Sequence, residues 1–272
     1  CLNTININDY ELSNLIVNDV YYQIFKIVEK NTSQTFSAKI YTEPDTNDDS
    51  SKDSISLLKY FSNEVDILRT INSPFIIKCI GINHIGFRDK PGYVVITEYM
   101  SNGTLEDLRF KKSNLSDNVL NETNKLIIIF GIASGMVNIH ENNIILRFLN
   151  PENIFLDDHL FPKIANFEYA TTSNKTDDLE EISMHLRVGG QKFISPEILN
   201  EETYDQSADI YSFGILLYYI ITGELPKIKL RQVLKGEKIP LKENIPQAYK
   251  NLIDVLHLIR KKDQTLKRLF LY

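Results

Sequence analysis

Hydrophobic and polar residues alternate between residues 15 and 41, which is the pattern of β-strands with one buried face. The tripeptide Asn31-Thr32-Ser33 interrupts the alternation and predicts a turn between two strands. Residues 42–56 are polar and acidic, so we expect a loop there. Apolar side chains then recur at helical spacing from Leu57 to Leu68, which predicts one amphipathic helix.

The rest of the chain begins with short strands and becomes mainly helical. Apolar runs rich in Ile and Val predict strands at residues 75–82 and 93–99. Helical patterns occupy residues 123–141, 207–222 and most of 245–270. Between them we expect short strands within residues 144–168 and a polar, acidic loop at residues 171–190.

This order of elements predicts an α+β fold with two unequal lobes. The smaller lobe is β-rich with one helix, and the larger lobe is mainly helical. We place the N-terminal lobe at about residues 10–99, a hinge at about 98–103 and the C-terminal lobe at about 104–272. Because no linker divides the chain, we interpret residues 1–272 as a single domain.

Composition narrows the possible functions. The formal net charge of −6 argues against a nucleic-acid partner. The longest apolar run, residues 213–221, is too short for a membrane span, and we expect no signal peptide at the start of the sequence. Two cysteines make no disulfide framework, so we expect a cytoplasmic location. The first glycine is Gly81, which excludes a glycine-rich phosphate loop in the strands before it.

Seven short motifs follow one another along the chain. They are Ser37-Ala38-Lys39-Ile40, Glu64 on the apolar stripe of its helix, Val95 to Met100, Ile145 to Asn153, Asn166-Phe167-Glu168, Ser195-Pro196-Glu197 and Asp209 to Gly214. In this order they resemble the V-A-I-K strand, the helix glutamate, the hinge, the catalytic loop, D-F-G, A-P-E and a buried helix of protein kinases. Phe148 and Asn166 are 18 residues apart, as are the two aspartates of that family.

The resemblance extends from about Tyr10 to Phe270 and implies a bilobal protein-kinase-like fold. Residues 125–136 and 160–164 are similar to protist members of the tyrosine-kinase-like group. Carried over residue by residue, the resemblance implies a nucleotide site that comprises Lys39, Glu64, Thr97 (the gatekeeper), Glu98, Met100 and Asn153. The Lys39–Glu64 pair has two interpretations, a contact to phosphate or a structural ion pair between strand and helix, and both stay open.

Residues that phosphoryl transfer requires are replaced. Phe148 stands at the position of the catalytic aspartate, so the base is missing, and Asn150 stands at that of the catalytic-loop lysine. The positions of the phosphate-loop glycines fall on Val17, Asp19 and Tyr22, which are either ordinary strand residues or, in the case of Tyr22, a plug in the pocket.

The metal positions are also altered. Asn153 is kept, but the principal Mg²⁺ ligand is Asn166, which lacks the charge that Mg²⁺ prefers. Glu168 replaces the glycine of D-F-G; it either supplies a carboxylate to a metal or is a solvated or ion-paired side chain, and the second is more common. We therefore expect no Mg²⁺ site.

Arg147 remains although the neighbouring aspartate is lost. The resemblance implies that this arginine grips a phosphorylated or acidic residue of the following loop, with Thr171 and Thr172 as regulatory candidates. The alternative is a plain hydrogen bond from Arg147 to backbone carbonyls.

Taken together, these losses predict a pseudokinase that acts in signalling as an allosteric partner or scaffold. Its partner would be another protein, such as an active kinase or a signalling adaptor, and ATP binding would be weak and independent of metal. Two alternatives stay open: an atypical active protein kinase that uses Glu168 or Asp19 with Asn153 for metal, and an interaction domain that binds no nucleotide.

Overall fold

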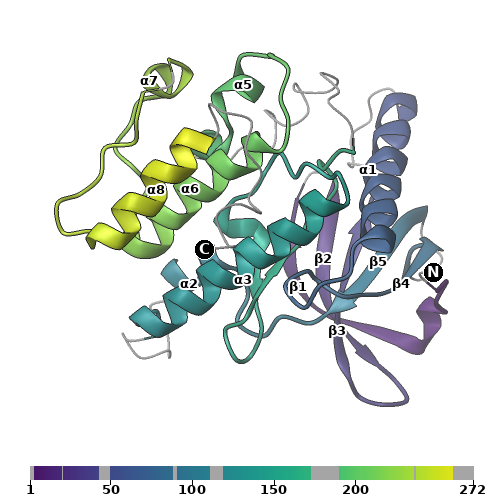
Figure 1. The fold of residues 1–272 in the computed structure, drawn as a ribbon. Coiled ribbons are helices and arrows are strands. Elements are labelled where there is room, and N and C mark those ends of the chain that lie inside the picture. Colours follow the sequence, from purple (N-terminus) through teal and green to yellow (C-terminus); the bar gives the residue numbers. More distant parts are fainter. Residues whose placement is uncertain are drawn as a thin grey trace.

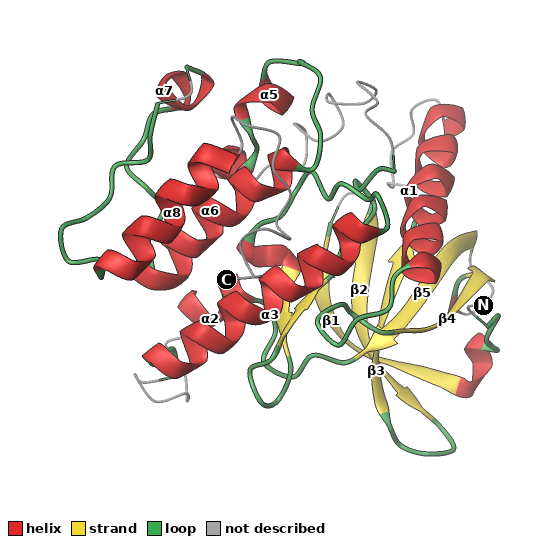
Figure 2. Cartoon of the chain, in the orientation of Figure 1, coloured by secondary structure: helices red, strands yellow, loops and turns green. Residues whose placement is uncertain are grey.

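The computed structural model describes residues 3–19, 21–42, 50–87, 91–110, 119–172, 190–235 and 237–259. The five-stranded sheet and one long helix form one lobe, and the other α-helices form the second lobe, with the chain crossing between the lobes after residue 98 (Figures 1 and 2). The α+β, two-lobed fold predicted from the sequence is therefore confirmed. No helix in the described ranges is both long and apolar enough to cross a membrane.

The small lobe is a five-stranded antiparallel sheet with strand order β1-β2-β3-β5-β4. Its strands are β1 (Tyr10–Asn18), β2 (Tyr22–Glu29), β3 (Thr35–Tyr41), β4 (Cys79–Ile85) and β5 (Pro91–Glu98). Helix α1 (Ser50–Thr70) lies along this sheet, where Phe61 stacks on Tyr93 of β5 with ring centroids 4.9 Å apart (Figure 1). The register pairs Lys39 of β3 with Val95 of β5, whereas the hinge end of β5 pairs Thr97 with Ser37.

Two sequence predictions in this lobe were wrong at their boundaries. The expected loop at 42–56 is too long, because α1 already begins at Ser50. The first two turns of α1 carry few apolar side chains, so hydrophobic periodicity does not reveal them. The strand expected from residue 75 begins at Cys79. Before it, Ile76 forms a bridge with Ile164 of the large lobe and ties the two lobes together.

The large lobe is built around helix α6 (Ser207–Thr222), whose residues from Ala208 to Ile220 are all buried. It packs against α3 (Glu122–Glu141) and α8 (Gln247–Ile259) and ends at Gly223, which caps it with a left-handed φ of 68°. The other described elements of this lobe are α2 (Leu105–Phe110), η3 (Pro151–Asn153), β6 (Ile154–Leu156), β7 (Pro162–Ile164), η4 (Gly190–Phe193), α5 (Pro196–Leu199) and α7 (Leu230–Leu234), whereas the short helix η1 (Ile7–Asp9) precedes β1 in the small lobe.

The β6–β7 hairpin carries the part of the large lobe that faces the small lobe. It packs directly on α3. A Cβ at Gly131 would meet Pro162 Cγ at 2.5 Å, and therefore only glycine permits this approach. The two strands pair in antiparallel register, and the Ala165 N–H donates to the Asn153 carbonyl at 3.0 Å. The hairpin thus brings Asn153, before its first strand, beside Asn166, after its second.

Candidate nucleotide cleft

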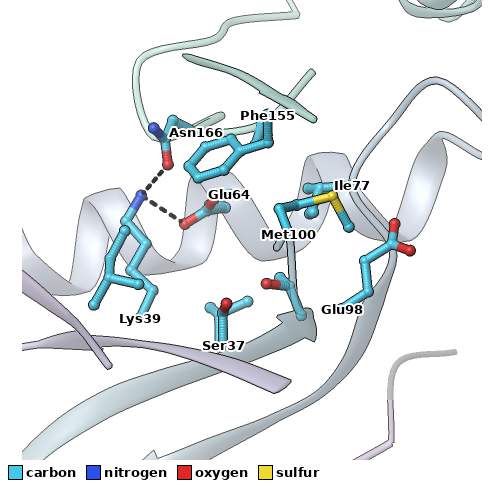
Figure 3. A pocket seen from close by; sticks show the side chains of 12 residues that line it. Ser37, Lys39, Glu64, Ile77, Glu98, Met100, Phe155 and Asn166 are labelled. Atoms are coloured by element: carbon cyan, nitrogen blue, oxygen red, sulfur yellow. Dashed lines mark hydrogen bonds and ion pairs between the residues drawn. The ribbon is translucent and has the colours of Figure 1, made fainter. Parts of the chain in front are cut away.

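A cavity lies between the lobes, against one face of the sheet and beside the hinge (Figure 3). It encloses about 440 Å³ when its open mouth is included. Its lining is Ile24, Ser37, Lys39, Glu64, Ile77, Val95, Thr97, Glu98, Met100, Phe155, Ala165 and Asn166. Most of the positions that the resemblance assigned to nucleotide binding therefore line one cavity, whereas Asn153 touches it only through Asn166.

Lys39 is held at the inner end of this cavity by three acceptors. Its Nζ lies 2.8 Å from Glu168 Oε2, 3.2 Å from Glu64 Oε2 and 3.3 Å from Asn166 Oδ1 (Figure 3 shows the last two). An ammonium group has three N–H donors. Lys39 therefore donates hydrogen bonds to Glu168 and Asn166 and forms an ion pair with Glu64, and both carboxylates are buried.

Aromatic rings enclose the same ammonium group. The Lys39 Nζ lies 4.3 Å from the ring centroid of Tyr22 and 5.2 Å from that of Tyr41. The Tyr41 hydroxyl in turn donates to the Glu64 carboxylate. Tyr22 stands where a phosphate-loop glycine would be, and its ring lies against the lysine ammonium group. Its pKa is raised, mainly by burial and then by the Glu168 carboxylate.

Burial and the charges of this cluster shift the pKa values of Lys39 and Glu168. Burial raises the pKa of Glu168, the Lys39 ammonium opposes this rise, and the Glu64 carboxylate adds to it. For Lys39, burial lowers the pKa, but the carboxylates of Glu168 and Glu64 outweigh burial and leave it raised. The lysine therefore stays charged, while two carboxylates share it.

The contribution of Glu168 to protein stability should fall as pH rises above about 4.5, the ordinary pKa of a glutamate. Because the folded-state pKa of Glu168 is raised, the folded protein holds this proton where the unfolded chain has already released it, and deprotonation weakens the fold across that interval. Urea unfolding from pH 4.5 to 8, compared with Glu168→Gln, measures the contribution of this side chain. The advantage of the wild type over the variant should shrink with pH, and an advantage that grows would contradict the assignment.

The two asparagines at the metal positions hydrogen-bond to each other. Asn166 Nδ2 donates to Asn153 Oδ1 at 2.8 Å, and Asn153 Nδ2 donates to the Phe148 carbonyl at 2.9 Å. The remaining amide oxygen, Asn166 Oδ1, accepts from Lys39. Mg²⁺ prefers anionic oxygen ligands, whereas here neutral amides meet amide protons and an ammonium group. The donor set does not fit Mg²⁺.

Phe148, which stands at the position of the catalytic base, borders this network, and its side chain has no group that can accept a proton. The Phe148 ring packs edge-on against Tyr169, with centroids 6.3 Å apart. Asn150, at the position of the catalytic lysine, is buried and accepts from the backbone N–H groups of Glu152 and Asn153. Its side chain caps the short helix η3, so the residue has a local structural role.

Arg147 is buried and is not part of the lining of the cavity. Its side chain donates to the Tyr169 carbonyl and to the Tyr204 hydroxyl, the latter at 3.3 Å. Thr171 pairs through its backbone with Ile145, in bonds of 2.8 and 2.9 Å, and Thr172 is exposed. Residues 173–189 lie outside the described residues, so the docking of a phosphate by Arg147 stays a prediction.

The hinge contributes Thr97, Glu98 and Met100 to the lining of the cavity. Thr97 lines the cavity at the end of β5, and Met100 is buried beside it. The Glu98 carboxylate lies 2.9 Å from Lys163 Nζ and accepts from the Lys78 N–H at 2.8 Å. This side chain thereby fastens the hinge to both lobes.

Two features of the site were not predicted from the sequence. One is the contact between Glu168 and Lys39, since the sequence indicated only that an ion pair was one fate of the glutamate. The other is Asn63, which donates from α1 to the carbonyls of Phe167, Glu168 and Ala170 at 3.2, 2.9 and 2.6 Å. Its position next to Glu64 in α1 is the only sequence signal that could have identified it.

Comparisons with known proteins agree with the geometry. The family model for the protein kinase domain matches residues 13–268. Serine/threonine-protein kinase STY17 of Arabidopsis thaliana is 30% identical over 170 residues, which is 62% of this chain and 28% of that protein. RGS domain-containing serine/threonine-protein kinase A of Dictyostelium discoideum is 32% identical over 203 residues, 72% of this chain and 17% of that protein. The chain thus spans less than a third of either relative, and it belongs to the protein kinase domain family.

Proposed function

We propose that this domain is a pseudokinase, which acts in signalling by binding another protein rather than by transferring phosphate. The observation that carries the proposal is the state of Lys39, which already donates to Glu168 and Asn166 and forms an ion pair with Glu64. A nucleotide phosphate would have to displace Glu168 or Asn166 to reach this lysine. In that process a buried carboxylate would lose its counter-ion, which is costly.

Further support comes from what surrounds the lysine. Phosphoryl transfer depends on a positioned base, metal ions and cationic groups that stabilise charge on the phosphoryl group. Phe148 offers no base, and Asn153 and Asn166 bind each other. We place the domain in the tyrosine-kinase-like group and in the cytoplasm, with an active kinase or a signalling adaptor as partner.

An active kinase is the second candidate. It is favoured by the retained Lys39–Glu64 pair, at 3.2 Å, and by relatives that are named serine/threonine-protein kinases. In that case Glu168 would have to leave Lys39 and turn toward a metal, together with Asn153. We favour the pseudokinase because this rearrangement would break a buried ion pair of 2.8 Å.

A thermal-shift titration with ATP, with and without Mg²⁺, tests the proposal. A ligand at about 100 times its dissociation constant stabilises a protein by about 2.7 kcal/mol, which is easily detected. We expect that Mg²⁺ adds nothing to any shift that ATP causes. A shift that requires Mg²⁺ would support the active kinase and direct attention to Glu168.

A further inference from the structure

A row of basic side chains lies around the short helix α7, at the end of the large lobe that is remote from the sheet (Figure 1). Residues 224–238 contain five basic and two acidic residues, although the formal net charge of the whole chain is −6. Four of the basic residues, here called the basic ridge, are exposed and follow one another closely: Lys227, Lys229, Arg231 and Lys235. This surface therefore differs in sign from the protein as a whole.

The charge of the basic ridge is not compensated within the domain. In the part of the chain that the structure describes, none of the four side chains forms an ion pair. The two carboxylates of the same segment are engaged elsewhere. Glu224 Oε2 lies 2.7 Å from Lys242 Nζ, and Glu237 Oε2 accepts from Gln232 Nε2 at 2.8 Å. The ridge therefore presents positive charge to the solvent.

The chain holds the four cations close together. Ile228 is buried between Lys227 and Lys229, which are both exposed, and two residues of chain span at most about 7 Å. Arg231 lies in α7 and Lys235 caps its end, and residues four apart on a helix lie about 6 Å apart on one face. These spacings are shorter than the Debye length at physiological salt, about 8 Å, so the potentials of neighbouring cations add.

A second element brings a fifth cation to the same surface. Lys192 of η4 donates from Nζ to the Pro226 carbonyl at 2.9 Å, which places its ammonium group beside the start of the ridge. Lys192 also forms no ion pair with a described residue. It is 34 residues from Pro226 in sequence, so the surface is assembled by the packing of η4 against α7.

A short acidic peptide matches this surface in charge and in spacing. Alternate side chains of an extended peptide lie about 7 Å apart on one side, close to the spacing of the ridge. Complementary charges speed association and fix the register of the partner. A long polyanion, such as a nucleic acid or an acidic membrane, would extend past the ridge and meet the negative charge that predominates in the rest of the chain.

We propose that the basic ridge, together with Lys192, binds an extended acidic segment of a partner protein. The inference rests on the proposed function, because it takes the binding of another protein as the role of the domain. It deepens that function by assigning a surface to the partner and a chemical class to the segment that the partner supplies.

A labelled peptide of alternating Glu and Ser is a suitable probe, with a peptide in which Gln replaces Glu as its neutral counterpart. Fluorescence anisotropy should show that the acidic peptide binds at least about tenfold more tightly, a difference of about 1.4 kcal/mol. Its affinity should fall between about 0.15 and 1 M NaCl, since the Debye length shortens from about 8 to about 3 Å. Equal binding of the two peptides, or an affinity that salt leaves unchanged, would overturn the proposal.

Two double variants assign the binding to this surface. Lys227→Glu with Arg231→Glu should weaken binding of the acidic peptide at least about tenfold, because both cations become repulsive. Lys30→Glu with Lys78→Glu makes the same change of net charge at exposed positions of the small lobe, and should change the affinity less than about twofold. Exposed substitutions of this kind cost little stability, which melting curves verify. Equal weakening in both variants would show that only net charge matters and would refute the ridge as the site.

The remaining outcomes decide the class of partner and separate this inference from the pseudokinase proposal. Single-stranded RNA or phosphatidylserine vesicles that bind the domain more tightly than the acidic peptide would contradict the assignment to a protein partner. If the peptide fails to bind and no phosphate is transferred, the surface assignment is wrong while the pseudokinase proposal stands. If the peptide binds the ridge and the domain also transfers phosphate, the surface assignment stands and the pseudokinase proposal is wrong.

Discussion

Glu168→Gln should raise the affinity of the domain for ATP by at least about tenfold. The substitution keeps the size of the side chain and removes the carboxylate that lies 2.8 Å from Lys39 Nζ. A neutral amide competes less strongly for the ammonium group than a charged carboxylate does, so a phosphate gains access to the lysine. Calorimetric titration of both proteins with ATP in EDTA measures the effect, where tenfold corresponds to about 1.4 kcal/mol.

Glu64→Gln is the matched control for this substitution. It also removes one carboxylate from Lys39, at 3.2 Å, but it leaves Glu168 as the remaining counter-ion. The Lys39–Glu168 pair should then hold at least as firmly, and ATP affinity should stay the same or decrease. An equal gain in both variants would show that lost negative charge alone explains the result, and that Glu168 has no special role in closing the site.

Asp209→Ala should be the most destabilising substitution that we predict. Asp209 is fully buried at the start of α6 and accepts from the backbone N–H groups of Leu146 and Arg147, both at 2.8 Å. It also lies 2.9 Å from His140 Nε2. Alanine would leave these donors buried without an acceptor, which costs about 3–5 kcal/mol. At about 2–4 °C per kcal/mol, the melting temperature should fall by roughly 10 °C.

The two hydrogen bonds to Asp209 also stabilise an unusual backbone. Arg147 has a φ of 64°, a left-handed conformation that is unfavourable for residues other than glycine. Asp254→Ala is a suitable comparison, since that aspartate forms an exposed ion pair with Lys238 at 3.1 Å. Its loss should cost less than about 1 kcal/mol. A similar small change for Asp209→Ala would mean that the catalytic-loop backbone does not depend on this carboxylate.

The fold was predictable because the pattern of hydrophobic residues, either periodic or continuous, marks most of its elements. Helix α6 matches its predicted range, residues 207–222, since nearly every side chain in it is buried and apolar. The start of α1 was missed because its first turns carry few apolar side chains to mark a face. The short helices α2, α5 and α7 were also missed, as elements of four to six residues carry too little pattern.

The site was predictable to the extent that single motifs position single residues. The partnership of Lys39 and Glu64 followed from a buried carboxylate that needs a cation. The third member, Glu168, is 129 residues from Lys39 in sequence, and no local pattern encodes that contact. The pairing of Asn153 with Asn166 likewise depends on the β6–β7 hairpin, because only the folded hairpin brings its two ends together.

Phosphotransfer from ATP tests the pseudokinase proposal most directly. The wild-type domain should be incubated with Mg²⁺, labelled ATP and generic protein substrates, beside a Lys39→Met variant that lacks the ammonium group. We predict that the two proteins transfer phosphate equally little, at the background of the assay. Activity in the wild type that disappears in Lys39→Met would contradict the account and establish the domain as an active kinase.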